Sequence, residues 1–139
     1  MDQGIAQQVI PAQRSLDQER ASHAWNKVEH RDGAGETTEK YCQVVRGMAA
    51  DIISNGLGQT LAFYKARAGK ERHYQWVLED TSDWVRQQLN QWLNPGIGEG
   101  ELIKWLVNTA NMDQYRLAKE ELVAYLMWLK RFAEAKQRE

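Results

Sequence analysis

The amino-acid sequence predicts an all-α protein, a single-domain helical bundle of about five to six helices. The chain has 139 residues, a length typical of one domain with its own core. Its two prolines, Pro11 and Pro95, leave long stretches without a helix breaker. Apolar residues recur every three or four positions, and no run shows the alternation typical of strands. We therefore expect residues 14–139 to form one helical domain, preceded by a loose arm over residues 1–13.

The first helix is expected to begin at Ser15 and to end near Asp32-Gly33. Ser15 with Gln18 three residues later is the pattern of a capping box. Four apolar residues then share one helical face: Ala21, Ala24, Trp25 and Val28.

A second helix should follow the turn at residues 33–35, with Thr37 or Thr38 as its cap. It has the most regular apolar stripe of the chain, so we expect it to be the most buried element. The stripe consists of Tyr41, Val44, Val45, Met48, Ala49, Ile52 and Ile53. Asn55-Gly56 is typical of a helix C-terminus, and a shorter helix restarts at once with Leu57, Leu61 and Tyr64 on its apolar face.

A long helix is predicted from about residue 71 to residue 93, where Asn94-Pro95-Gly96 ends it. Thr81 and Ser82 are a possible bend or break, and Trp76 lies opposite the apolar stripe. That stripe consists of Tyr74, Val77, Leu78, Val85, Leu89 and Trp92.

Two more helices complete the predicted bundle. The first is short, over residues 99–110, and should bury Leu102, Ile103, Leu106 and Ala110 while Trp105 points elsewhere. The last helix is expected to be capped by Asp113. Its core stripe consists of Tyr115, Ala118, Leu122, Tyr125, Leu126, Leu129 and Ala133. A second apolar line, Leu117, Ala124 and Trp128, lies on its other side, so this helix is either central in its own bundle or packed against another chain.

No residue pattern indicates catalysis, a metal site or a cofactor, so we expect a protein that is not an enzyme. His23, His30 and His73 do not form a zinc-binding HExxH motif, and a lone Cys42 on the apolar side of its helix is interpreted as a packed core thiol. A small hydrolase using His73 with Glu79 or Asp80 remains a minor alternative.

Two further motifs have simpler interpretations. Residues 56–58, Gly-Leu-Gly, lack the preceding strand and third glycine of a dinucleotide-binding loop, so they are interpreted as a turn. Glu79, Asp80 and Asp83 are interpreted as a solvated helix face.

The sequence also favours a cytoplasmic protein with no membrane partner and no small-molecule substrate. One cysteine excludes an intrachain disulfide, and the N-terminus lacks the features of a signal peptide. No apolar run approaches the roughly 20 residues that a membrane span requires.

Basic residues gather between the third and fourth predicted helices, where Lys65, Arg67, Lys70 and Arg72 face a lone Glu71. Lys130 and Arg131 add a second basic pair, whereas the segment from residue 79 to 121 has eight carboxylates and only four bases. Such a segregated surface neutralises phosphates without reading sequence, and the alternative is an ordinary solubilising face.

The chain contains six tryptophans, of which Trp76, Trp105 and Trp128 fall off the main apolar stripes. Because tryptophan is enriched among interface anchors, these three residues and Leu117 are candidates for contacts with a protein partner. The alternative is that a small bundle buries both sides of some helices.

Two runs, IISNGLGQTLAFYKARA at residues 52–68 and LMWLKRFAEA at residues 126–135, resemble the small subunit of the type III-B (Cmr-type) CRISPR RNA-guided effector complex. The resemblance extends in order of elements over residues 14 to 136. It implies an all-helical, non-catalytic subunit of an antiviral ribonucleoprotein. Such a subunit stacks in several copies beside the guide-RNA-binding backbone, among the other Cmr-type subunits, and turns a basic face toward target RNA. An adaptor that binds only protein is the main alternative.

Overall fold

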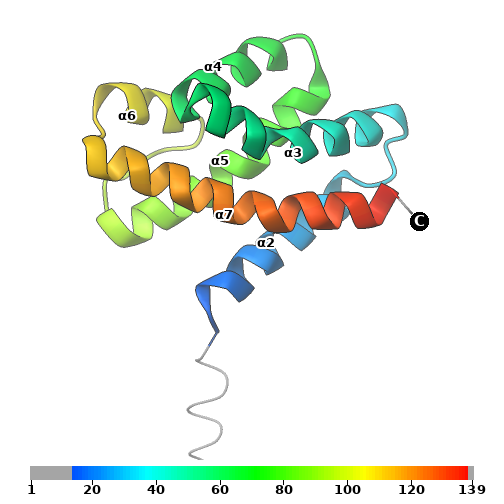
Figure 1. The fold of residues 1–139 in the computed structure, drawn as a ribbon, viewed down its shortest axis with the longest axis horizontal. Helices are drawn as coiled ribbons and strands as arrows, with labels where there is room; N and C mark the ends of the chain where they lie inside the picture. The colour runs from blue at the N-terminus through cyan, green and yellow to red at the C-terminus, as the bar shows by residue number, and fades with distance from the viewer. Residues whose placement is uncertain (1–13, 138–139) are drawn as a thin grey trace, which may run out of the picture.

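The structure, a computed structural model, describes residues 14–137, and within them it contains six α-helices and no strand (Figure 1). The helices are α2 (Leu16–Arg31), α3 (Glu36–Asn55), α4 (Leu57–Ala68), α5 (Arg72–Leu93), α6 (Leu102–Asn108) and α7 (Met112–Gln137). The predicted all-α, single-domain fold class is confirmed. The predicted arm over residues 1–13 lies outside the described residues.

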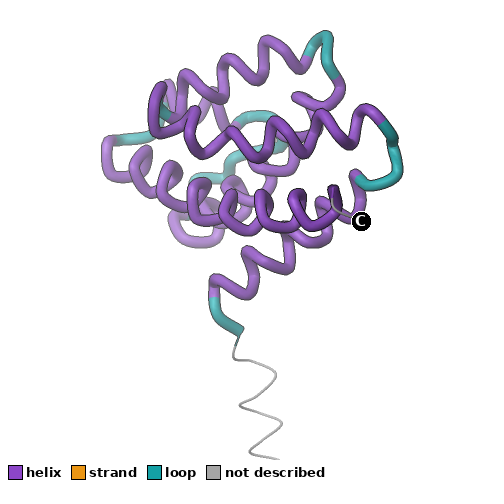
Figure 2. The backbone as a smooth tube through the Cα atoms, turned by 45° about the vertical axis from the view of Figure 1, so that its right-hand side comes forward, coloured by secondary structure: helices purple, strands orange, loops and turns teal. Residues whose placement is uncertain are grey.

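Helices α3 and α7 run side by side in opposite directions across the front of the molecule, and α5 passes behind them (Figure 1). α4 lies above α3 and packs on α5, while α6 closes one end. α2 packs mainly on α7, and its first turns project beyond the other helices in both views (Figures 1 and 2). None of the described helices is long and apolar enough to cross a membrane.

The core lies between α3, α5 and α7. Its largest fully buried side chains are Tyr41, Met48, Ile52, Leu57, Leu61, Leu89, Leu122, Tyr125, Leu126 and Leu129. Cys42 is also buried, as predicted, and burial raises the pKa of its thiol. Ile53, which belongs to the predicted apolar stripe of α3, is instead 70% exposed.

The turn between α3 and α4 confirms the predicted helix restart at Asn55-Gly56. Gly56 has a φ of +87°, which side chains with a Cβ atom rarely adopt, and its N–H donates to the Ile52 carbonyl. Two residues later the Gly58 N–H donates to the Tyr115 hydroxyl over 2.7 Å, so this turn is joined to the start of α7.

The sequence assigns capping residues to the starts of α2, α3 and α7, and only the assignment for α2 is confirmed. The Ser15–Gln18 capping box of α2 is present as predicted. α3 is not capped by Thr37 or Thr38, because it begins earlier, at Glu36 with Gly35 as its N-cap residue, and the Thr38 hydroxyl instead donates to the Arg31 carbonyl.

The predicted cap of the last helix is also wrong, by two residues. Asn111, not Asp113, accepts the Gln114 N–H through Oδ1, and the Gln114 side chain accepts the Asn111 N–H in return. α5, in contrast, continues through Thr81 and Ser82 without a break, and the buried Thr81 hydroxyl donates to the Val77 carbonyl of the same helix.

Candidate nucleic-acid interface

Three exposed basic residues lie where α4 leads into α5: Arg67 in the last turn of α4, Lys70 in the connection and Arg72 at the first position of α5. We call them the basic corner. Arg67 donates from Nε to Glu71 over 3.1 Å, which uses the one carboxylate of this segment. Lys70 and Arg72 form no ion pair with any described residue. The corner therefore retains an uncompensated positive charge in contact with solvent.

Lys65 belongs to a different surface, although it lies only two residues before Arg67. It lines a groove of about 890 Å³ between α2, α4, α5 and the segment before α6. Four carboxylates line the same groove, from Glu79, Asp80, Asp83 and Glu99, together with the basic residues Lys27, Arg31 and Arg86. The groove thus has mixed charge, in contrast to the basic corner.

Lys130 and Arg131 lie on α7, which crosses the molecule below α3, whereas the basic corner lies above it (Figure 1). Arg131 pairs with Glu134 at 3.6 Å, and Lys130 is partly buried without an ion pair among the described residues. The six predicted basic residues are therefore divided among three surfaces instead of forming one stripe.

Aromatic rings accompany the basic corner, a feature that the sequence pattern alone did not predict. Arg67 lies over both Phe63 and Tyr74, with its guanidinium carbon 5.3 and 5.2 Å from the two ring centroids. Burial lowers the pKa of the neighbouring His73 despite the opposing charge of Glu71, and the charges of Lys40 and Arg67 lower it further. The signal was present in the sequence, since Phe63 and Arg67 are four residues apart on one helix.

The acidic group on α5 is not a solvated face, so that prediction is wrong for its central residue. Asp80 is fully buried and accepts two hydrogen bonds from Arg31 and one from the Tyr41 hydroxyl, at 2.7 to 3.1 Å. Burial together with the Asp80 charge raises the pKa of Tyr41 far above its usual range. These partners are distant in sequence, so helical periodicity alone gave no sign of them.

A second buried carboxylate ties α2 to α5 and α7. Glu121 accepts from Arg20 Nε and Nη2 at 2.7 and 2.8 Å, and from the Trp84 indole at 2.8 Å. Each carboxylate accepts three hydrogen bonds from protein donors, as is typical of a structural group. Within the described residues no cluster of three or more His, Cys, Asp or Glu side chains is arranged to hold a metal ion.

The pairing required by the hydrolase alternative is not formed. His73 is buried against Tyr74, and its nearest carboxylate is that of Glu71, at 4.0 Å. It makes no hydrogen bond to Glu79 or Asp80 in the described structure, because Asp80 is held by Arg31 and Tyr41.

The predicted interface residues differ in their surroundings. Trp105 packs in the core at 9% exposure, so the prediction that it points elsewhere is wrong. Trp76 is partly buried, with the Arg31 guanidinium 4.9 Å from its ring centroid, and Leu117 packs against the core. Because α6 has only 7 residues, its sequence pattern gives little indication of which side of the helix is buried.

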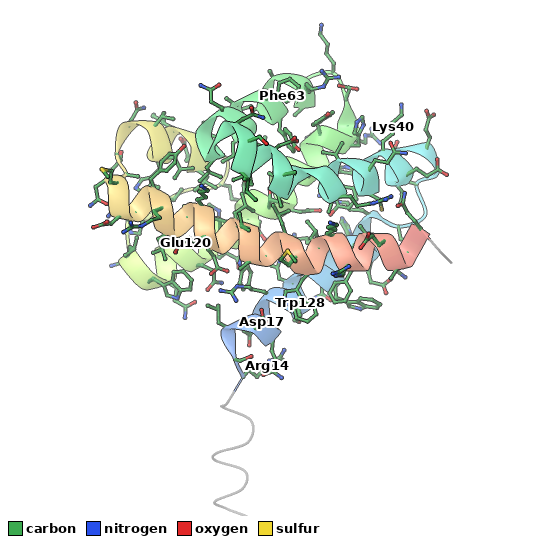
Figure 3. All side chains as sticks on the ribbon, viewed as in Figure 1. Arg14, Asp17, Lys40, Phe63, Glu120 and Trp128 are labelled. Carbon is green, nitrogen blue, oxygen red and sulfur yellow. The ribbon has the colours of Figure 1, made fainter. Side chains whose placement is uncertain are left out.

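Trp128 belongs to an aromatic cluster with Trp25 and Phe132, which we call the α2–α7 aromatic cluster. The ring centroid of Phe132 lies 5.2 Å from that of Trp25 and 5.7 Å from that of Trp128. The Trp128 indole donates to Asp17 over 2.9 Å, and both residues are seen at the lower edge of Figure 3. Trp25 remains 43% exposed, so the cluster presents an aromatic surface to solvent.

Comparison with known proteins agrees with this architecture. Residues 16–136 match the family model described as CRISPR-associated protein (Cas_Cmr5). The fold is similar to the X-ray crystal structure of a CRISPR-associated Cmr5 family protein from Thermus thermophilus, with a TM-score of 0.69 and 25% sequence identity over 88% of this chain and 97% of that chain. The chain therefore belongs to the Cmr5 family, the small subunits of the type III-B Cmr effector complex.

Proposed function

We propose that the chain is a non-catalytic structural subunit of the Cmr complex that stacks in several copies beside the guide-RNA-binding backbone and contacts target RNA through the basic corner. Family membership supports its place in the complex. The observation that favours RNA contact is the exposure of Lys70 and Arg72 without a neutralising carboxylate.

Lys65, Lys130 and Arg131 are secondary candidates for RNA contact. The carboxylates around Lys65 repel a phosphate backbone, and Arg131 already pairs with Glu134. A single copy offers few phosphate contacts, so the isolated chain should bind weakly. Repeated copies along one RNA strand would increase the effective concentration of each contact.

The test is the salt dependence of RNA binding by the assembled complex. Lys70→Gln with Arg72→Gln should weaken binding to every target sequence and reduce the slope of log affinity against log salt by about 0.7 for each phosphate that the variant no longer neutralises. Lys104→Gln with Lys119→Gln is the matched control, because it also removes two charges that have no ion pair among the described residues. This control should leave the slope unchanged.

The competing function, an adaptor that binds only protein, is favoured by the α2–α7 aromatic cluster. It predicts the same salt slope for the Lys70/Arg72 variant and the wild type, with the variant subunit fully incorporated. That result would reject RNA contact by the basic corner and favour the role in assembly.

A further inference from the structure

Phe63 is an exposed aromatic residue that the fold does not require. The side chains that α4 buries are Leu57, Thr60, Leu61 and Tyr64. Phe63 lies on the outer side, 53% exposed, at the upper edge of the molecule in Figure 3. Much of its ring therefore remains open to a ligand.

The open ring is nevertheless held in one position. Its centroid lies 6.5 Å from that of Tyr74 with the rings at 86°, so Tyr74 meets it edge-on. Arg67 adds its guanidinium 5.3 Å from the Phe63 centroid, and Glu71 fixes Arg67 through an ion pair. Tyr74 itself rests on the buried Tyr64, with centroids 5.1 Å apart.

Positive charge follows this aromatic surface directly along the chain. Lys70 and Arg72 lie between Arg67 and Tyr74 in the chain, and neither has an ion-pair partner among the described residues. An exposed ring beside unneutralised cations matches the surface that binds single-stranded nucleic acid, in which bases stack on aromatic rings and cations hold the adjoining phosphates. An anchor for an apolar protein surface would not need these charges.

We propose that Phe63, oriented by Tyr74 and Arg67, stacks with one unpaired base of the bound RNA while Lys70 and Arg72 hold the adjoining phosphates. This inference rests on the proposed RNA contact and assigns it a base-stacking residue. Stacking tolerates any base, so the site adds affinity without adding sequence specificity.

The experiment uses the assembled complex and target RNA carrying 2-aminopurine at one position at a time. Phe63→Leu keeps an apolar side chain but removes the ring, and Phe63→Tyr restores the ring. Trp92→Leu is the matched control, since it removes another partly exposed aromatic residue about 27 Å further along α5 from Tyr74. Affinity, salt slope and 2-aminopurine fluorescence are measured for each complex.

Phe63→Leu should weaken binding about fivefold or more, given the contribution of roughly 1 to 3 kcal/mol per stacked base, and should leave the salt slope unchanged. At least one 2-aminopurine position should be quenched in the wild type and in Phe63→Tyr, and should regain fluorescence in Phe63→Leu. Trp92→Leu should behave as the wild type does.

Three outcomes would overturn the proposal, and they separate it from the function on which it rests. If Phe63→Leu is silent while Lys70→Gln with Arg72→Gln flattens the salt slope, RNA contact stands and stacking is rejected. Silence of both variants rejects stacking together with RNA contact by the basic corner. Loss of the Phe63→Leu subunit from the complex, with its helical content intact, would make Phe63 a protein contact.

Discussion

Gly56 and Gly58 are required for different physical reasons, although they are separated by one residue. Gly56 occupies a positive φ with open space around the position of a Cβ atom, so its constraint is conformational. Gly58 has no such φ, but a Cβ there would lie 2.8 Å from the Tyr115 hydroxyl oxygen, so its constraint is steric. The Asn-Gly-Leu-Gly motif thus combines a backbone requirement with a packing requirement.

The two constraints predict different mutational behaviour. Gly56→Val should lower the free energy of unfolding by about 1 to 3 kcal/mol through backbone strain. Gly58→Ala should cost a similar amount through overpacking, about 1 to 3 kcal/mol. Adding Tyr115→Phe removes the obstructing oxygen, so the double variant should be more stable than the sum of the two single effects predicts. Urea midpoints of Gly58→Ala, Tyr115→Phe and the double variant, each compared with the wild type, measure this coupling.

Tyr115→Phe combined with Gly56→Val is the control, because Gly56 does not meet Tyr115. Its two effects should add. Strictly additive effects of Gly58→Ala and Tyr115→Phe would contradict the steric explanation.

His23 gives the fold a dependence on pH. Its Nε2 lies 2.9 Å from a carboxylate oxygen of Asp83, which can only accept, so the neutral ring carries its proton there, while the Tyr125 hydroxyl donates to Nδ1 over 2.6 Å. Burial lowers the pKa of His23 from its usual 6.5, despite the opposing influence of Asp83. Below about pH 6.5 the unfolded chain therefore binds more protons than the folded chain does.

The free energy of unfolding should therefore fall as the pH decreases below about 6.5, by at most about 1.4 kcal/mol per pH unit, until the folded protein also binds the proton. His73 contributes in the same direction, because its pKa is also lowered. His23→Gln should flatten the dependence between pH 6.5 and the acid range. Equal slopes for the wild type and His23→Gln would refute this assignment.

Among the elements, α2 is held by polar contacts more than by apolar burial. Only Ala24 and Val28 of this helix are buried. Arg20 meets Glu121, and Arg31 meets Asp80 and lies against Trp76. Removing one partner of such a pair leaves a buried charge, which is more costly than the pair itself is stabilising.

Arg31→Met should therefore destabilise the protein by about 3 to 5 kcal/mol, since Asp80 would keep only the Tyr41 hydroxyl as a partner. Asp80→Asn added to Arg31→Met should recover part of this loss, because a neutral amide oxygen still accepts from Tyr41. Arg14→Met, which breaks the exposed pair with Glu19, should cost less than about 1 kcal/mol in the same urea titrations. A loss for Arg31→Met as small as that for Arg14→Met would show that Asp80 gains other partners.

The helices also show which features can be predicted from one sequence and which cannot. Ser15 with Gln18 and Asn55-Gly56 were found correctly, because their hydrogen bonds or backbone conformation depend on residues a few positions apart. The burial of Asp80 was missed, since its partners lie 39 and 49 residues away. The six basic residues proposed from the sequence are divided among three surfaces, which follows from how α4, α5 and α7 pack.

At the scale of the whole molecule, the two candidate contact surfaces lie on opposite edges. Figure 3 places Phe63 at the upper edge on α4, and Trp128 with Asp17 at the lower edge where α2 meets α7. A subunit that contacts RNA at one edge and protein at the other can occupy both surfaces at once. Substitutions at one surface should then leave contacts at the other intact.

Trp128→Ala tests this separation. If Trp128 anchors a neighbouring subunit, the variant should weaken incorporation into the complex by about 2 kcal/mol or more. The isolated chain should keep nearly all its helical content, because Trp128 is only partly buried and its hydrogen bond goes to the exposed Asp17. Val107→Ala, at a 62% exposed position on α6, is the control and should incorporate normally.

The measurement pairs circular dichroism of the isolated chain with the fraction of subunit retained when complexes are assembled from limiting amounts. Complexes that do retain Trp128→Ala should bind RNA with an unchanged salt slope per incorporated copy, because the basic corner is untouched. If the isolated variant unfolds, Trp128 is instead a core residue, since its contacts with Phe132 and Asp17 would then be needed to hold α2 on α7. In that case the protein-contact surface must lie elsewhere.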